Sequence, residues 1–187
     1  MQTEHIELTP KGRRTRSALV DAAGTIIGRE GVTGLSIMSV CAEADVGRTS
    51  FYNYFEDLDA LREAVAIKAT RTIKNRFDGL HADQPRGLKR LEGCLSMILH
   101  LAAKDRETIL LVTALAETTP EIGGLLEAEI DAELAAAFSS HTREREALAR
   151  FLSVSVMALS RELAKGHLPP NSIPLHLSFL MRASRNG

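Results

Sequence analysis

Residues 36–65 read SIMSVCAEADVGRTSFYNYFEDLDALREAV, and they predict two short helices joined by a tight turn. Ser36 suits the N-cap of the first helix. The apolar positions of that helix recur at helical spacing along one face, at Ile37, Val40, Cys41 and Ala44. The second helix is expected from near Gly47 to Phe55. Because two short helices joined by three or four residues cross at a steep angle, this stretch predicts a helix-turn-helix unit.

The joint between the two helices is Ala44-Asp45-Val46-Gly47. Asp45 stands where a left-handed backbone conformation is often needed. Asp adopts that conformation less readily than Gly but more readily than most residues. Val46 is placed to fill the angle between the helices. We therefore expect a compact turn with slight strain at Asp45.

Four of the eight aromatic residues of the chain lie within positions 51–55, and helical phase divides them between two sides. Phe51 and Phe55 are four residues apart and are expected in the core with Val46. Tyr54 is expected at the margin, beside Ser50. The outward side is expected to carry Arg48, Thr49, Tyr52 and Asn53.

The outward side offers a guanidinium, a hydroxyl, a phenol and an amide, which are groups that read nucleic acid. Arg bonds guanine edges or phosphate, Asn pairs with adenine, and Thr or Tyr reaches phosphate or a thymine methyl. A helix of this kind fits the major groove. A short polar helix face is usually plain solvated surface, so the pattern alone leaves both interpretations open.

Positive charge is concentrated near the N-terminus, although the formal net charge of the chain is only −1. Lys11, Arg13, Arg14 and Arg16 lie within six residues, with no acid among them. Such a run is either a solvated arm or an element that contacts phosphates.

The rest of the chain is helical by periodicity, with no strand-like alternation and no internal repeat. Helices are expected at about 14–31, 36–44, 47–55, 56–77, 85–103, 106–118, 120–140, 143–165 and 172–184, with a loop at 78–86. The sequence therefore predicts an all-α protein of about nine helices. Residues 1–57 would form an N-terminal head that contains the helix-turn-helix, and residues 58–187 a C-terminal bundle.

Composition argues against several classes of function. The chain of 187 residues is 44% hydrophobic and 25% charged, as is ordinary for a globular protein. Its two cysteines, Cys41 and Cys94, are too far apart for a metal knuckle or a disulfide framework, and buried inert thiols are favoured. No apolar run approaches the roughly 18 residues of a membrane span, so a cytoplasmic protein is expected. No catalytic motif or spaced histidine set is present, so we expect no enzyme activity, metal or cofactor.

From about Arg14 to Val65 the chain resembles the TetR family of bacterial transcriptional regulators. The family pattern has a Ser or Thr cap, two short helices and an aromatic-rich end to the second, and it is matched by Ser36, Val40, Ala44, Val46, Phe51, Tyr52, Tyr54, Phe55 and Leu61. Three positions depart from it. Cys41 stands where the family usually has Ala, and Asp45 where it has Gly. Leu58 replaces a Lys that commonly meets a phosphate.

The resemblance implies a homodimer that binds a palindromic operator in double-stranded DNA, represses transcription and releases the DNA when a small ligand binds. The head would read DNA and the bundle would hold the ligand and the dimer contact. Carried over to this chain, the DNA-binding residues would be Arg14, Ser36, Arg48, Thr49, Ser50, Tyr52, Asn53 and Tyr54.

The bundle is less informative. A pocket for a hydrophobic or amphipathic ligand is expected near the middle of its helices, at Met97, His100, Leu101, Leu111, Thr113, Phe138 and Met157, although such residues are more often plain core. The last two helices carry more apolar surface than one small bundle needs. They predict a dimer interface at Phe151, Leu152, Leu159, Leu163, Leu175, Phe179 and Leu180.

The alternative interpretation is a helical adaptor whose head binds protein instead of DNA. The missing Lys at Leu58 and the neighbouring acids Glu56, Asp57 and Asp59 favour it. A DNA-binding head differs from such an adaptor because its affinity falls steeply as salt rises.

Overall fold

The computed structural model describes residues 9–81, 85–138 and 142–185, and within these ranges it confirms the all-α prediction. Nine α-helices and two short 3-10 turns occupy the described residues. They are α1 (Pro10–Glu30), η1 (Val32–Gly34), α2 (Ile37–Glu43), α3 (Arg48–Tyr52), α4 (Leu58–His81), α5 (Leu88–Lys104), α6 (Arg106–Thr118), α7 (Pro120–Ala137), α8 (Thr142–Lys165), η2 (Pro170–Ser172) and α9 (Ile173–Arg185).

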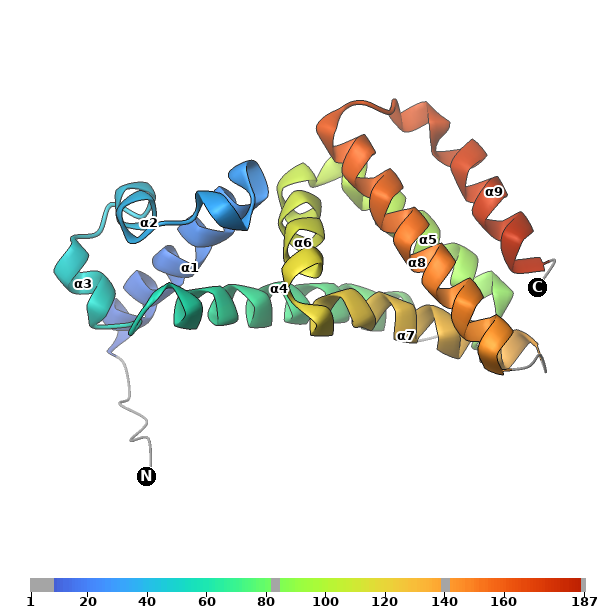
Figure 1. The fold of residues 1–187 in the computed structure, drawn as a ribbon, viewed down its shortest axis with the longest axis horizontal. Coiled ribbons are helices and arrows are strands. Elements are labelled where there is room, and N and C mark those ends of the chain that lie inside the picture. The colour runs from blue at the N-terminus through green and yellow to red at the C-terminus, as the bar shows by residue number, and fades with distance from the viewer. Residues whose placement is uncertain (1–8, 82–84, 139–141, 186–187) are drawn as a thin grey trace, which may run out of the picture.

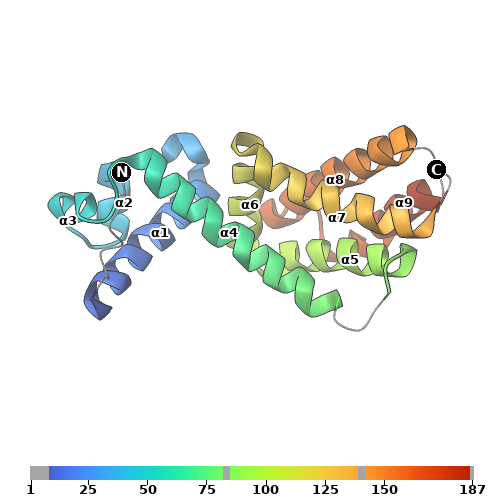
Figure 2. The ribbon, with the colours of Figure 1, turned by 90° about the horizontal axis from the view of Figure 1, so that it is seen from below.

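The molecule is elongated, with α1–α3 at one end and α5–α9 at the other (Figures 1 and 2). Helix α4 starts beside α3 and runs from the first group toward the second in both views. Among the described residues, no single helix is long and apolar enough to span a membrane. Helix α6 and Ile122–Ala137 reach that length and composition only as a pair, bent by 99° where they meet.

Several helix boundaries differ from the predicted ones. Helix α1 begins at Pro10, because the Thr9 hydroxyl accepts the Gly12 N–H at 3.1 Å and Pro suits the first position of a helix. Helix α3 ends at Tyr52 instead of Phe55. Helix α4 continues to His81, so the loop predicted at 78–86 is wrong over residues 78–81. A lone Gly costs a helix only about 1 kcal/mol, so Gly79 does not stop it.

Two apolar cores hold the fold together. The C-terminal core is formed by α5–α9 and includes Leu95, Leu99, Leu134 and Val156. The N-terminal core contains buried residues of the head, among them Leu19, Ile26 and Phe51. It also contains buried residues that follow position 57 in the chain, namely Leu61, Val65, Val112, Leu115 and Ile122. The head is therefore completed by α4, α6 and the start of α7.

Helices α1 and α6 approach each other closely at Gly28. A Cβ atom added there would lie 3.3 Å from the Glu107 carbonyl oxygen and 3.4 Å from the Leu111 backbone nitrogen. Both neighbours are backbone atoms, which cannot rotate away as a side chain can. The missing side chain at Gly28 thus sets the distance between the head and α6.

The bundle buries one carboxylate. Glu133 is 1% exposed; its Oε1 lies 3.0 Å from Arg90 Nε, and its Oε2 accepts the Gly87 N–H at 2.9 Å. These contacts tie the start of α5 to α7. Burial and, to a smaller extent, the charge of Glu133 together raise the pKa of the nearby Cys94 thiol to about 12. Burial also raises the pKa of Cys41, so both thiols are protonated at neutral pH.

The close approach at Gly28 predicts different effects of the same substitution at two helical glycines. The methyl group added by Gly93→Ala in α5 would point into open space, so this substitution is expected to stabilise the protein by about 0.5–1 kcal/mol. The free energy of unfolding of Gly28→Ala is expected to be at least about 1 kcal/mol lower than that of Gly93→Ala, because overpacking against backbone atoms is costly. Urea unfolding of the two variants measures the difference. Equal stabilisation would show that α1 and α6 are not held at this distance.

Candidate nucleic-acid interface and apolar cavity

Helix α2 begins with reciprocal hydrogen bonds between two serines. The Ser36 hydroxyl accepts the Ser39 N–H at 3.0 Å, and the Ser39 hydroxyl accepts the Ser36 N–H at 3.0 Å. The two hydroxyls lie 2.9 Å apart. This capping box confirms Ser36 as the N-cap. The side chain that was also predicted to face DNA therefore has a local structural role.

The turn after α2 is closed by two backbone hydrogen bonds. The Val46 N–H donates to the Cys41 carbonyl at 2.9 Å, and the Asp45 N–H donates to the Ala42 carbonyl at 3.3 Å. This is the Schellman pattern, which places a left-handed residue just after the helix. Asp45 has φ 51°, the sole positive φ outside glycine in the described part of the chain. The predicted left-handed residue at Asp45 is confirmed.

The inner side of α3 is fixed by two buried rings. Phe51 is 0% exposed and Phe55 4%, and their ring centroids lie 5.9 Å apart. The Arg16 guanidinium stands over the Phe55 ring at 4.9 Å, which places the basic run of α1 beside the end of α3. The core assignment of Phe51 and Phe55 is confirmed, and Val46 packs half-buried against the same core.

The outer side of α3 is polar and open to solvent. Arg48, Thr49 and Asn53 are exposed, and Tyr52 is 50% exposed while its ring meets the Phe51 ring edge-on at 5.4 Å. One side of the Tyr52 ring thus contacts Phe51, and half of the residue stays open to solvent. The remaining two predicted residues of this segment, Ser50 and Tyr54, are half-buried. Exposure agrees with the predicted division, and contact with DNA stays a prediction.

The acidic start of α4 is explained by its structure. Asp57 Oδ1 accepts the Ala60 N–H at 2.8 Å and so caps the helix, and Asp59 forms an ion pair with Arg62. Leu58 is half-buried and packs against the N-terminal core. Its side chain therefore contributes to the core, which accounts for an apolar residue at this position.

A groove between α1 and α4 extends the basic run. Arg13 and Arg16 of α1 line it together with Lys68 and Arg71 of α4. Lys68 also forms an ion pair with Asp21, which offsets part of the charge. The predicted Arg14 is exposed on α1. Sequence reasoning missed Lys68 and Arg71, although their spacing of three places them on one helix face.

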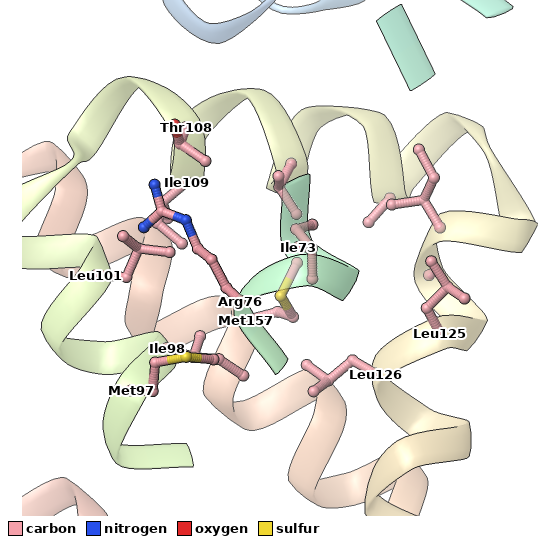
Figure 3. Close-up of a pocket in the computed structure, with 14 residues that line it drawn as sticks. Ile73, Arg76, Met97, Ile98, Leu101, Thr108, Ile109, Leu125, Leu126 and Met157 are labelled. Carbon is pink, nitrogen blue, oxygen red and sulfur yellow. The ribbon is translucent and has the colours of Figure 1, made fainter. Parts of the chain in front are cut away.

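An apolar cavity lies where α4 meets the bundle (Figure 3). Its volume is about 70 Å³. The cavity is therefore narrow. Helices α4–α8 all contribute to its wall. The residues that line it include Ile73, Met97, Leu101, Val112, Leu126 and Met157.

Three of the seven predicted pocket residues line this cavity, namely Met97, Leu101 and Met157. The other four do not. His100 is exposed, and its Nδ1 lies 2.8 Å from the Ser96 carbonyl oxygen of the preceding turn. Leu111 instead packs on the side of α6 that faces α1. A Cβ atom added at Gly24 of α1 would lie 3.4 Å from Leu111 Cδ2.

The remaining two predicted pocket residues, Thr113 and Phe138, also lie away from the cavity. The buried Thr113 hydroxyl donates to the Leu110 carbonyl at 3.1 Å, which satisfies it within its own helix. Phe138 follows the end of α7 and packs against the C-terminal core. In both cases the helical pattern signals burial without telling a core from a cavity.

Among the described residues that line the cavity, Arg76 alone carries a charge, and sequence reasoning missed it. Its Nη2 donates to Asp105 Oδ2 at 3.0 Å, across from α4 to the joint between α5 and α6. Asp105 Oδ1 also accepts the Thr108 N–H at 3.3 Å and so caps α6. In the sequence Arg76 is one of many charges on a helix, and only the fold brings it to the cavity.

The predicted interface residues divide by burial. Leu152, Leu163 and Leu180 lie in the C-terminal core, because the side of each helix on which they lie faces the other helices of the bundle. The dimer contact stays a prediction. Leu159 is half-buried. Exposed side chains remain on both α8 and α9, at Phe151 (55% exposed), Val154, Leu175 and Phe179 (56% exposed). They are four of the eight large apolar or aromatic side chains that are strongly exposed in the described residues.

Comparison with known proteins finds helix-turn-helix regulators. No protein-family model matches the chain. An uncharacterized HTH-type transcriptional regulator of Bacillus subtilis (strain 168), YobS, is 33% identical over 61 residues, which is 33% of this chain and 32% of that protein. The match thus spans about a third of the curated relative.

Solved structures match nearly the whole chain. A TetR-like regulator from Rhodococcus sp. RHA1 superposes with a TM-score of 0.75 at 17% identity, over 92% of this chain and 94% of that one. A gamma-butyrolactone receptor described as an ArpA-like protein superposes with a TM-score of 0.68 at 17% identity, over 96% of this chain and 100% of that one. NalD of Pseudomonas aeruginosa is the secondary repressor of the MexAB-OprM multidrug efflux pump. It superposes with a TM-score of 0.67 at 15% identity, over 92% of this chain and 96% of that one. The chain has the all-α fold of the TetR-like transcriptional regulators.

Proposed function

We propose that this chain is a DNA-binding transcriptional regulator that acts in the cytoplasm as a homodimeric repressor and leaves its palindromic operator when a small apolar ligand binds. Residues 1–57 would form the DNA-binding part, and residues 58–187 would hold the ligand and the dimer contact. One observation carries the proposal: α3 and the turn after it expose Arg48, Thr49, Tyr52 and Asn53 to solvent, while Phe51 and Phe55 fix the opposite side in the core.

The surroundings of α3 support a DNA interface. The Schellman turn at Asp45 sets the crossing of α2 and α3, and Arg16 stands beside Phe55. Positive charge on α1 and α4 supplies a salt-dependent attraction for phosphates on which base contacts can act. A single helix of five residues gives little affinity alone. Two heads in a dimer add their binding energies at high effective concentration.

The cavity supports ligand control because it shares its wall with the head. Val112 and Ile122 belong to the N-terminal core and also line the cavity. Helix α4 carries Leu61 and Val65 into the same core and lines the cavity further along with Ile73. A ligand that widens the cavity would move side chains on which the head rests. The fold neighbours include a receptor for a gamma-butyrolactone and an efflux-pump repressor, which fits this interpretation.

The DNA interface predicts a specific change in salt dependence. Arg48→Gln is expected to weaken binding to sheared genomic duplex DNA. The negative slope of log K against log salt should become less steep by about one, since one phosphate contact is lost. Arg143→Gln removes the same charge from the exposed start of α8, far from the head, and should leave the slope unchanged. Fluorescence anisotropy across a salt series measures both.

Two outcomes would contradict this interface. Equal slopes for Arg48→Gln and Arg143→Gln would remove α3 from the contact. Absence of duplex binding by the unaltered protein at low salt would reject the regulator and favour the protein-binding adaptor instead.

The tyrosine on α3 separates DNA contact from folding. Tyr52→Phe keeps the ring contact with Phe51 and removes only the hydroxyl, so it should weaken DNA binding without changing the midpoint of thermal unfolding. Phe55→Ala leaves a hole in the core and should destabilise the protein by about 3–5 kcal/mol. Circular dichroism melts together with duplex binding compare the two. A matching loss of stability in both variants would contradict the division of α3 into two sides.

The exposed rings of α8 and α9 predict the oligomeric state. The double variant Phe151→Asp and Phe179→Asp is expected to change a dimer into a monomer, because each buried ring contributes about 1.5–3 kcal/mol and a buried carboxylate costs more. Ile67→Asp alters a comparably exposed side chain on α4 and should leave the dimer intact. Sedimentation velocity gives the masses. A monomeric unaltered protein, or a double variant that stays dimeric, would contradict this interface.

A further inference from the structure

The cavity has one polar end and one apolar end. Arg76 is the sole charged side chain among the described residues that line it, and no Lys or His accompanies it. Figure 3 shows the Arg76 guanidinium near Thr108 and Leu101, while Leu125 and Leu126 lie at the opposite side. A molecule that fills this space along its length would meet a cation and a hydroxyl first and only apolar side chains after that.

The cation at the polar end already holds a carboxylate. Arg76 Nη2 lies 3.0 Å from Asp105 Oδ2, and the two side chains are 40% and 35% exposed. Ion pairs this open to solvent contribute little stability, so a competing carboxylate can replace Asp105 at small cost. The planar guanidinium presents paired N–H groups that match the two oxygens of a carboxylate.

We propose that the cavity binds an apolar monocarboxylate whose head group takes the place of Asp105 on Arg76 and whose chain extends toward Leu126. This inference rests on the proposed function of the cavity as the ligand site. A dianion would leave one charge without a partner in an apolar wall, and a cation would be repelled by Arg76. An uncharged ligand would gain less from Arg76, because its oxygen accepts a weaker hydrogen bond than a carboxylate does.

The shape of the cavity favours a slender chain over a bulky ring system. The cavity volume is only about 70 Å³, so a ligand has to push side chains apart as it enters. Met97 and Met157 line the cavity, and Met side chains readjust easily because three of their bonds rotate freely. A flexible alkyl chain can follow a narrow space that these side chains open.

Displacement of Asp105 releases α4 without unfolding α6. The Arg76 contact uses Asp105 Oδ2, whereas the cap of α6 uses Asp105 Oδ1, which accepts the Thr108 N–H at 3.3 Å. The cap can therefore persist after the ion pair is lost. The ligand then removes a link between the far half of α4 and the α5–α6 joint, and the near half of α4 carries Leu61 and Val65 of the N-terminal core.

The experiment compares decanoate, decanol and decyltrimethylammonium by isothermal titration calorimetry with the full chain. Decanoate is expected to bind at least about tenfold more tightly than decanol, because hydrogen bonds to a charged group add to the burial of the same chain. Decyltrimethylammonium is expected to bind weakest. Arg76→Met should remove the preference for decanoate and change the affinity for decanol far less.

Asp105→Asn is the matched variant that removes the competing charge. Asn caps helices as well as Asp does, so α6 keeps its N-cap, which a thermal melt checks. Decanoate should bind this variant several-fold more tightly, and decanol should bind it as before. A wild-type protein that prefers decanol or binds neither compound, or an Arg76→Met variant that loses both equally, would overturn the proposal.

Binding of duplex DNA, measured on the same preparations without ligand, keeps the two claims separate. Decanoate binding of the predicted kind without any DNA binding would reject the regulator and retain the carboxylate site. DNA binding without a preference for decanoate would reject the carboxylate site and retain the regulator.

Discussion

The apolar stripe of α1 has to be buried, and the helices that follow it in the chain are too short to bury it. Helix α2 has seven residues and α3 has five, and each contributes few buried side chains. The stripe is covered only because α4 and α6 join the N-terminal core through Leu61, Val65, Val112 and Leu115. The head is thus fastened to the bundle by the same contacts that fold it.

This constraint gives the cavity two connections to the proposed DNA-binding surface. One runs along α4, and the other runs through α6, whose backbone comes close to α1 at Gly28. Val112 and Ile122 belong to both the cavity wall and the N-terminal core. Complete reversal of a two-state equilibrium takes a difference in binding free energy of about 5.5 kcal/mol, and smaller differences still change operator occupancy many-fold. Packed side chains that shift together can supply such a difference.

Local features of the head could be predicted from the sequence because they depend on near neighbours. The cap at Ser36, the left-handed Asp45 and the burial of Phe51 and Phe55 all follow from spacing within one or two turns of helix. The fold class follows equally well from periodicity over the whole chain. These predictions needed no knowledge of which helices meet.

Predictions about the bundle were weaker because they depended on which helices meet. Apolar spacing marks Leu152 and Leu163 as buried but does not say whether the partner belongs to the same chain. Phe138 and Leu111 were predicted to line the cavity from their residue type and their place in the bundle, and in the fold each packs against one of the two cores instead. Arg76 was overlooked for the same reason: its role depends on Asp105, 29 positions away in sequence.

Selection of bound sites from random duplex DNA tests the central claim most directly. A dimer that carries two copies of α3 should enrich an inverted repeat whose half-sites lie about 10–10.5 base pairs apart, or a multiple of that spacing, because both helices enter the major groove on one face of the duplex. Enrichment of such a repeat would support a regulator that reads its operator with α3. A bound pool that stays random after repeated rounds would contradict it.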